Sequence, residues 1–445
     1  MNATVRQFEP VQATTVAEVE SQALCARVLD LLLTHRGNPS AEIERVLAHD
    51  PQCLFAHCLR AALVVRADKT AGRSRLAESV AAIEALCPDR NHRARRHAAA
   101  ARAWLDGDPN LAAECYGAVV NDWPRDVLAL AVAHALDFHL GQRRLMRDRI
   151  AWVLPAWHAA MPGYASVLAM YAFGLEENAQ YALAEEIARR ALALDPGHPG
   201  AIHVLIHVME MQGRCLEGLE FLAATEKSWS EGTGFSVHLA WHRALFHLDA
   251  NNAAPALATY DAQISIARSS DMAALADASA LLWRLKLCNI EVNDRWRQLA
   301  DHWEMQTLIG ARPFYIVHAM MAFAATGRVA AAEKAFAALP LINTDETSRP
   351  SEDALAPPLC EALLAFAGND YAACIAWLAR VRHIATLCGG SVAQCDVVHL
   401  TFTEAALRAR QLRLAGALVA ERMSEKPTSM FNRLLLRRLR VSSRH

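Results

Sequence analysis

The sequence predicts an all-α protein, built as an α-solenoid or superhelix of about ten to eleven helical hairpins. Three observations lead to this prediction. Two series of helix-breaking residues each recur at nearly constant intervals, the segments between them carry the apolar spacing of helices, and no segment alternates apolar and polar residues as a strand does. Such regular punctuation is typical of stacked repeats that bury a shared core.

The first series consists of prolines that end apolar segments at intervals of 34 to 38 residues. They are Pro51, Pro88, Pro124, Pro162 and Pro196. The second series consists of glycine or asparagine at intervals of 34 to 41 residues, interleaved with the first. Its members are Gly37, Gly72, Gly107, Gly141, Asn178, Gly213, Asn251, Asn289, Gly327 and Gly368. Two interleaved series leave segments about as long as a helix of three to four turns. Each repeat is therefore predicted to be a helical hairpin.

The segments between breakers have helical composition. Residues 81–87 (AAIEALC), 111–120 (LAAECYGAVV) and 188–195 (ARRALALD) place alanine and leucine at three- and four-residue spacings. These are strong helix formers, and the spacing lines up one apolar face for packing.

Polar stretches without such spacing suggest the chain's organisation. We expect residues 1–20 to be a flexible N-terminal segment and residues 21–423 to be one continuous solenoid. Residues 342–353 are expected to be an exposed loop, and the arginine-rich residues 424–445 a basic tail or cap.

The composition of the chain indicates which classes of partner and which cellular compartment to expect. The 445 residues carry a formal net charge of −2, which gives no general attraction to nucleic acid or to acidic membranes. No apolar run is long enough to span a bilayer, and the N-terminus does not resemble a secretory leader. Eleven cysteines lie at irregular spacings, which favours free thiols in a reducing compartment. We therefore expect a cytoplasmic protein with no nucleic-acid or membrane partner.

Two His-x-x-x-His pairs mark the middle of the chain. His203 and His207 are followed three residues later by Glu210, and His238 and His242 form the second pair. At 3.6 residues per turn, positions i, i+4 and i+7 share one helix face, so His203, His207 and Glu210 point the same way. Both pairs are predicted on the first helix of their hairpins, the helix that lines the concave side.

Further polar and aromatic residues recur at similar heights on neighbouring first helices. Asp277 and Arg284 are seven residues apart on one face, where Arg284 is expected either to anchor an anion or to form a salt bridge between repeats. The full set of candidate substrate-binding residues is Glu176, Glu177, Trp241, Asp277, Arg284 and His318. We expect residues 163–325 to form the ligand-binding core.

Three interpretations of the histidines remain open. Imidazole and carboxylate together suit a divalent metal such as Zn, Mn or Fe, with His203, His207, Glu210, His238 and His242 as ligands. In a metal-free cleft the same residues would act as acid–base groups. They would otherwise be hydrogen-bonded core residues. A zinc-protease motif is excluded, because no glutamate follows the first histidine of either pair.

The period and the alanine and leucine pattern are those of tetratricopeptide-type repeats. Several strings further resemble the tetratricopeptide repeat protein 38 family: 171–196, 203–218 (HVLIHVMEMQGRCLEG), 238–248, 277–285, 317–323 and 389–397 (GGSVAQCDV). Weaker matches at 96–108 and 124–141 extend the resemblance over roughly residues 90–420. It implies an all-α repeat superhelix and does not choose between enzyme and scaffold.

The functional prediction is a His- and Glu-lined concave pocket that binds a small organic molecule, with acid–base or metal-assisted catalysis. The alternative is a non-enzymatic scaffold whose groove holds a peptide or a partner protein, as many repeat arrays do. A catalytic pocket should be closed and deep with the histidines at its floor, whereas a scaffold groove should be long and open.

Overall fold

The computed structural model describes residues 16–67, 72–89, 92–230, 234–265, 271–339 and 352–442. Over these residues the secondary structure is helical, with no strand. The chain divides into two compact units, Met1–Leu205 and Ile206–His445. Both are built from tetratricopeptide-like antiparallel helical hairpins, so the predicted fold class is confirmed. No helix in the described ranges is both long and apolar enough to cross a membrane.

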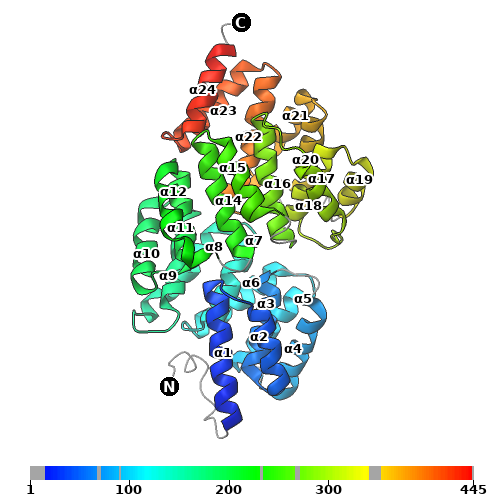
Figure 1. Ribbon diagram of the computed structural model, residues 1–445. Coiled ribbons are helices and arrows are strands. Elements are labelled where there is room, and N and C mark those ends of the chain that lie inside the picture. Colours follow the sequence, from blue (N-terminus) through cyan, green and yellow to red (C-terminus); the bar gives the residue numbers. More distant parts are fainter. Residues whose placement is uncertain are drawn as a thin grey trace. The chain divides into compact units, whose positions relative to one another are not determined.

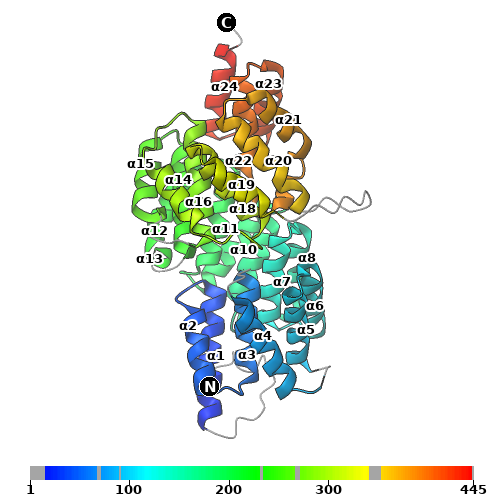
Figure 2. The same cartoon turned by 90° about the vertical axis from the view of Figure 1, so that its right-hand side faces the viewer.

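In the first unit, consecutive helices pair as antiparallel hairpins that stand side by side (Figure 2). The pairs are α1 with α2, α3 with α4, α5 with α6, α7 with α8 and α9 with α10. Their bounds are α1 Val16–Thr34, α2 Pro39–His49, α3 Leu54–Ala67, α4 Arg73–Leu86, α5 Arg93–Leu105, α6 Pro109–Asp122, α7 Val127–His139, α8 Arg143–Val153, the 3-10 turn Leu154–Ala156, α9 Tyr164–Glu176 and α10 Tyr181–Leu194. Helix α11, Pro199–Met211, crosses the division between the units.

The predicted breakers lie in the turns of the hairpins. Gly107 and Gly141 have φ of 91° and 66°, in the left-handed region that glycine adopts without a Cβ clash. In the fifth hairpin the positive φ falls on Ala179, one residue after the predicted Asn178, whose amide instead donates to the carbonyl oxygens of Arg143 and Gly174. The prolines lie between hairpins, as Pro124 does between α6 and α7.

The second unit continues the pattern from α12 onward. Its helices are α12 Cys215–Ala224, α13 Glu226–Trp229, α14 Gly234–Asp249, α15 Ala253–Thr259, the π-helical turn Tyr260–Ile264, α16 Met272–Leu287, α17 Arg295–Glu304, α18 Pro313–Thr326, α19 Val329–Ala337, α20 Glu352–Ala367, α21 Tyr371–Val381, the 3-10 turn Ala385–Cys388, α22 Val392–Arg408, α23 Leu412–Glu425 and α24 Met430–Ser442. Turns with positive φ at Asn251, Asn289 and Gly327 each join the two helices of one hairpin.

The second unit also folds back on itself. Helix α22 packs beside α16, and α24 contacts α14 (Figure 1). The buried indole Nε1–H of Trp283 donates to Thr401 Oγ1 at 3.0 Å, across 118 residues of sequence. In a simple solenoid each repeat touches only its neighbours. Here the C-terminal helices cover the polar faces of α14 and α16, and this closure builds the site described below.

The expectations for the two ends of the chain and for the polar loop can be compared with the described residues only in part. Residues 1–15 and 340–351 lie outside the described residues, and so do most of the predicted flexible start and exposed loop. Helix α1 already begins at Val16. The arginine-rich C-terminus is largely helix α24, which buries Asn432 and Leu435 and pairs Arg438 with Glu404 at 3.0 Å.

Candidate functional site

The two histidines of α14 form the centre of a polar cluster in the second unit. His242 is fully buried, whereas the side chain of His238 is 17% exposed. They are four residues apart and therefore point the same way from the helix. The ring of His238 stacks on the buried indole of Trp241, with centroids 5.4 Å apart and an interplanar angle of 15°. Trp241 thus fixes the orientation of the more exposed ring.

Each of these histidines is held by its own carboxylate from a neighbouring helix. His242 Nδ1 lies 2.8 Å from Glu210 Oε2 on α11, and His238 Nδ1 lies 2.8 Å from Asp277 Oδ2 on α16. A carboxylate oxygen can only accept, so both Nδ1 atoms carry protons and donate them. The other oxygen of Asp277 accepts from Gln394 Nε2 at 3.2 Å, which ties the cluster to α22.

The remaining nitrogens of the two rings face each other. His242 Nε2 and His238 Nε2 are 3.2 Å apart. A hydrogen bond between them would need a third proton on the pair, since both Nδ1 protons are already donated to carboxylates. Two neutral imidazoles carry only two protons. The geometry therefore calls for one additional positive charge between the Nε2 atoms, either as a proton on one ring or as a cation bound to both.

His207 places a third imidazole ring beside His238 and His242. Its ring centroid lies 4.5 Å from that of His242, and one ring nitrogen of each of His207, His238 and His242 falls within 4.8 Å of the others. Burial lowers the pKa of His242 well below its ordinary value, and the neighbouring His207 and His238 lower it further. Neutral imidazole is the form that binds metals.

Three predicted residues belong to the first unit. His203 lies on α11, one turn before His207, and its ring packs on Phe173 with centroids 5.4 Å apart. Glu176 is buried at the end of α9. Glu177 follows it, and Glu177 Oε2 pairs with Arg143 Nε at 3.2 Å. Within the first unit, Glu177 therefore ties α9 to α8 through this ion pair.

Arg284 lies on the face of α16 that meets α22, as Asp277 does. Its two terminal nitrogens donate to the carbonyl oxygens of Ala280 at 3.1 Å and of Ala393 at 2.8 Å. Its guanidinium carbon lies 5.4 Å from the centre of the Trp241 ring. Asp277 and Arg284 thus share a face as predicted, but each has partners other than the salt bridge considered from sequence. Two turns separate them along the helix.

His318 has the contacts of a core histidine. It is buried on α18, its Nδ1 lies 2.7 Å from the carbonyl oxygen of Phe314, and its ring packs on Phe314 with centroids 4.3 Å apart. Burial lowers its pKa to about 4. The structure gives it a hydrogen-bonded place in the helix packing.

A cavity of about 70 Å³ lies beside the cluster and opens toward solvent. Its apolar wall includes Leu245, Phe246 and Leu287, and Glu210 and Arg284 form part of its polar side. The histidines themselves, Trp241 and His318 do not line this cavity. This cavity is distinct from the expected pocket with histidines at its floor, and it adjoins His242 through Glu210, the hydrogen-bond partner of His242.

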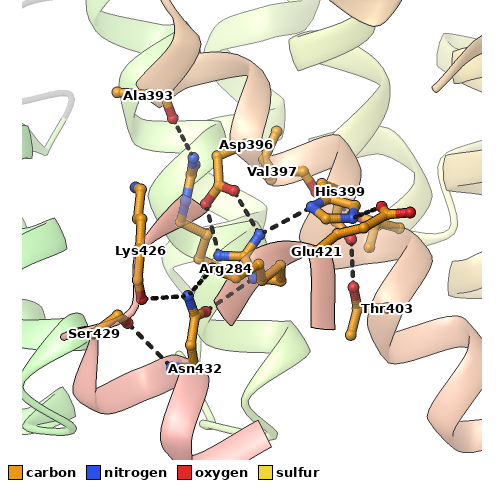
Figure 3. A network of polar contacts seen from close by, with 12 residues as sticks. Arg284, Ala393, Asp396, Val397, His399, Thr403, Glu421, Lys426, Ser429 and Asn432 are labelled. Carbon is orange, nitrogen blue, oxygen red and sulfur yellow. Dashed lines mark hydrogen bonds and ion pairs between the residues drawn. The ribbon is translucent and has the colours of Figure 1, made fainter. Parts of the chain in front are cut away.

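The C-terminal helices supply further polar lining, in addition to Asp249 of α14. Asp396, Glu404, Arg422 and Lys426 border the cavity. Arg422 holds Asp396 through two contacts, at 2.5 and 3.2 Å, and donates to Asn432 at 3.0 Å. Figure 3 shows this network around Arg284, with the carbonyl of Ala393 above it. None of these C-terminal residues was among the candidates from sequence.

The carboxylates of this network lie beside positively charged side chains. Burial alone would raise the pKa of Asp396, but the guanidinium of Arg422 and the ammonium of Lys426 bring it well below its usual value. Lys426 Nζ also lies 3.9 Å from Glu210 Oε1. The carboxylate of Glu210 is thus placed between a histidine and an ammonium. The string GGSVAQCDV contained Gln394 and Asp396, and it was the signal that could have pointed to this region.

The chain was compared with protein-family models and with solved structures. No family model matches the chain. Among solved structures, the chain is similar to Cut9 in the APC/C hetero-tetramer Cut9–Hcn1, with 12% identity, 98% of this chain and 79% of that chain covered, and a TM-score of 0.46. It is similar to human IFIT1 in a dimer with m7Gppp-AAAA, with 12% identity, 99% of each chain covered and a TM-score of 0.45.

A third similar structure is PilW, a type IV pilus biogenesis factor, with 15% identity, 56% of this chain and 94% of that chain covered, and a TM-score of 0.28. All three are tetratricopeptide-type helical repeat proteins. At these identities and TM-scores the similarity carries no argument for a shared activity or ligand.

Proposed function

We propose that the second unit is a metal-dependent binding and catalytic module in which His207, His238 and His242 bind a divalent transition metal and the adjoining cavity holds a small organic molecule. One observation carries the proposal. The Nε2 atoms of His238 and His242 converge to 3.2 Å while each Nδ1 is held by a carboxylate. This pattern leaves two lone pairs pointing at one place.

The spacing of the nitrogens fits a metal. In a tetrahedral zinc site with Zn–N bonds near 2.0–2.1 Å, two ligand nitrogens lie about 3.3–3.4 Å apart. The observed 3.2 Å is close to this value. A bound cation also removes the need for a third proton on the pair, since both neutral imidazoles then donate from Nδ1 and bind through Nε2. Zinc, manganese and iron all accept such ligands.

The carboxylates fit the role of outer partners. Metal-binding histidines almost always donate their second N–H to a carboxylate or a carbonyl, which fixes the tautomer and makes the ring more basic. Glu210 and Asp277 occupy these positions at 2.8 Å. This assignment differs from the sequence-based prediction, in which Glu210 was itself a ligand. His203, which the sequence also offered as a ligand, belongs to the first unit.

The organic ligand is expected in the cavity between Glu210 and the C-terminal helices. Leu245, Phe246 and Leu287 offer an apolar wall, and Arg284 and Lys426 offer positive charge to an anionic group. A metal held by three histidines would keep a coordination position open for water and would lower the pKa of that water. Glu210 connects the cavity with the histidine cluster.

The test is the metal content of the purified, untagged protein, measured by plasma mass spectrometry. About one equivalent of zinc, manganese or iron is expected, and His207→Ala and His242→Ala should each lose it. His302→Ala is the matched control, because His302 lies on α17 and its Nδ1 contacts the carbonyl oxygen of Gln298. Its metal content should equal that of the parent protein.

A metal-free protein that takes up none of the three ions would sink the proposal. The histidines would then be interpreted as hydrogen-bonded core residues of a structural scaffold. This interpretation predicts that histidine substitutions destabilise the second unit, because buried polar groups lose their partners. It also predicts that these substitutions abolish no chemical activity. Thermal unfolding of the same variants, measured alongside the metal content, separates these outcomes.

We also propose a protein family, a cellular location and a class of ligand for this chain. We infer membership of the tetratricopeptide repeat protein 38 family from the strings at 203–218 and 389–397, which carry His203, His207, Glu210, Gln394 and Asp396. A cytoplasmic location agrees with the free cysteines of the described residues. A small molecule, in preference to a nucleic acid, agrees with the small net charge.

A further inference from the structure

Two cysteines of the first unit lie close enough to react with each other. Cys25 on α1 and Cys53, directly before α3, have their sulfur atoms 3.8 Å apart, although 28 residues separate them. Cys25 is fully buried, whereas Cys53 is partly exposed. A disulfide needs the sulfurs at about 2.05 Å, so rotation of the two side chains must bring them closer. This contact is unrelated to the histidine cluster.

The two thiols differ in chemical character. The thiol of Cys25 acts as the hydrogen-bond donor that lowers the pKa of Cys53, and the backbone N–H groups of Ala56 and Phe55 at the start of α3 lower it further. The same contact, together with burial, raises the pKa of Cys25 well above its usual value. A helix N-terminus stabilises a thiolate and makes that cysteine the reactive partner.

We propose that Cys53 and Cys25 form a reversible peroxide-sensitive disulfide, with Cys53 as the attacking thiolate and Cys25 as the resolving thiol. The proposal rests on the 3.8 Å contact, on the partial exposure of Cys53 and on the place of Cys53 at the start of a 14-residue helix.

The chemistry balances with hydrogen peroxide as the oxidant. The Cys53 thiolate attacks one peroxide oxygen, so an S–O bond forms, the O–O bond breaks and hydroxide leaves. Sulfur is oxidised by two electrons, and the peroxide is reduced. The Cys25 sulfur then attacks the sulfenic acid sulfur, forming the S–S bond and breaking the S–O bond. The departing hydroxide takes the Cys25 proton and becomes water. A dithiol reductant reverses the reaction.

The bond would change the first hairpin. It closes a loop that contains the whole of α2 and ties α1 to the start of α3. Cys58, on the same helix α3, is fully buried and lies one turn further on. Burial raises its pKa to well above its usual value, so it is not expected to compete for the peroxide.

The test uses the full-length protein, treated with substoichiometric hydrogen peroxide, alkylated and digested without reduction. Mass spectrometry should find a peptide that joins Cys25 to Cys53, two hydrogens lighter than the sum of its parts and lost on treatment with dithiothreitol. In Cys25→Ser, a cyclic 1,3-dione should trap sulfenic acid at Cys53. In Cys53→Ser, Cys25 should remain a thiol.

Cys115 is the internal control, because it is also partly exposed in the first unit but burial raises its pKa. We expect Cys53 to be oxidised at least tenfold faster than Cys115. Equal rates at the two sites would overturn the proposal. So would oxidation of Cys53 to a sulfenic acid that never joins Cys25 in the parent protein, since the 3.8 Å contact would then have no chemical consequence.

Discussion

Replacing Glu210 with glutamine separates the two roles considered for this residue. The Oε2 atom of Glu210 accepts from His242 Nδ1 at 2.8 Å, and Oε1 lies 3.9 Å from Lys426 Nζ. An amide keeps the shape and can still accept from His242 through its oxygen. It removes the negative charge and turns an N–H₂ group toward the ammonium. The side chain is only 9% exposed, so solvent screens this change weakly.

Loss of a carboxylate partner of a metal-binding histidine typically costs 10- to 100-fold in metal affinity, which is about 1.4–2.7 kcal/mol. We expect Glu210→Gln to weaken zinc binding within this range and to leave the stoichiometry at one. Competition with a chromophoric chelator measures the dissociation constant. Glu217→Gln is the matched control, because Glu217 lies on the exposed side of α12 and pairs with Arg214. Unchanged affinity in Glu210→Gln would refute the assignment of Glu210 as an outer partner, and complete loss of metal would make it a ligand.

Three further predictions follow from other contacts. Asp277→Asn should also weaken metal binding about 10- to 100-fold, measured in the same competition assay, because Asp277 orients His238. Asp396→Asn should destabilise the second unit by about 2–4 kcal/mol in urea unfolding, since it leaves Arg422 buried without its carboxylate. The pKa of Asp396 is lowered on folding, so the stability that its carboxylate contributes is present above about pH 4 and is lost as the pH falls below that value. The free energy of unfolding of Asp396→Asn should therefore fall less steeply in acid than that of the parent protein. Oxidation of Cys25 and Cys53 should stabilise the first unit by about 3–4 kcal/mol, seen as a higher unfolding midpoint that Cys25→Ser abolishes.

The fold was accessible from sequence because its determinants are local. A glycine or asparagine turn and a proline connector act within a few residues, so their spacing predicted the hairpins. Gly107, Gly141 and Gly213 indeed have positive φ in the turns. The one-residue shift from Asn178 to Ala179 has a local cause as well, since the Asn178 amide is engaged by carbonyl oxygens of α8 and α9.

The site could be predicted only in part from the sequence, because many of its contacts join segments that are far apart in the chain. Helical periodicity predicted that Asp277 and Arg284 share a face, and both do meet α22. Periodicity carries no information on which later helix covers that face, so Gln394 and Lys426 were missed as partners of Asp277 and Glu210. The sequence placed Glu210 and His242 together as ligands of one metal, but helical spacing could not show that Glu210 accepts a hydrogen bond from His242 Nδ1.

X-ray absorption spectroscopy at the edge of the bound metal tests whether the histidines of the second unit hold that metal. We expect a first shell of nitrogen and oxygen near 2.0–2.1 Å for zinc, with the outer-shell scattering of three imidazoles. His242→Ala should reduce that imidazole scattering or abolish metal binding. A shell of oxygen alone, a sulfur shell near 2.3 Å or a spectrum unchanged in His242→Ala would contradict this expectation.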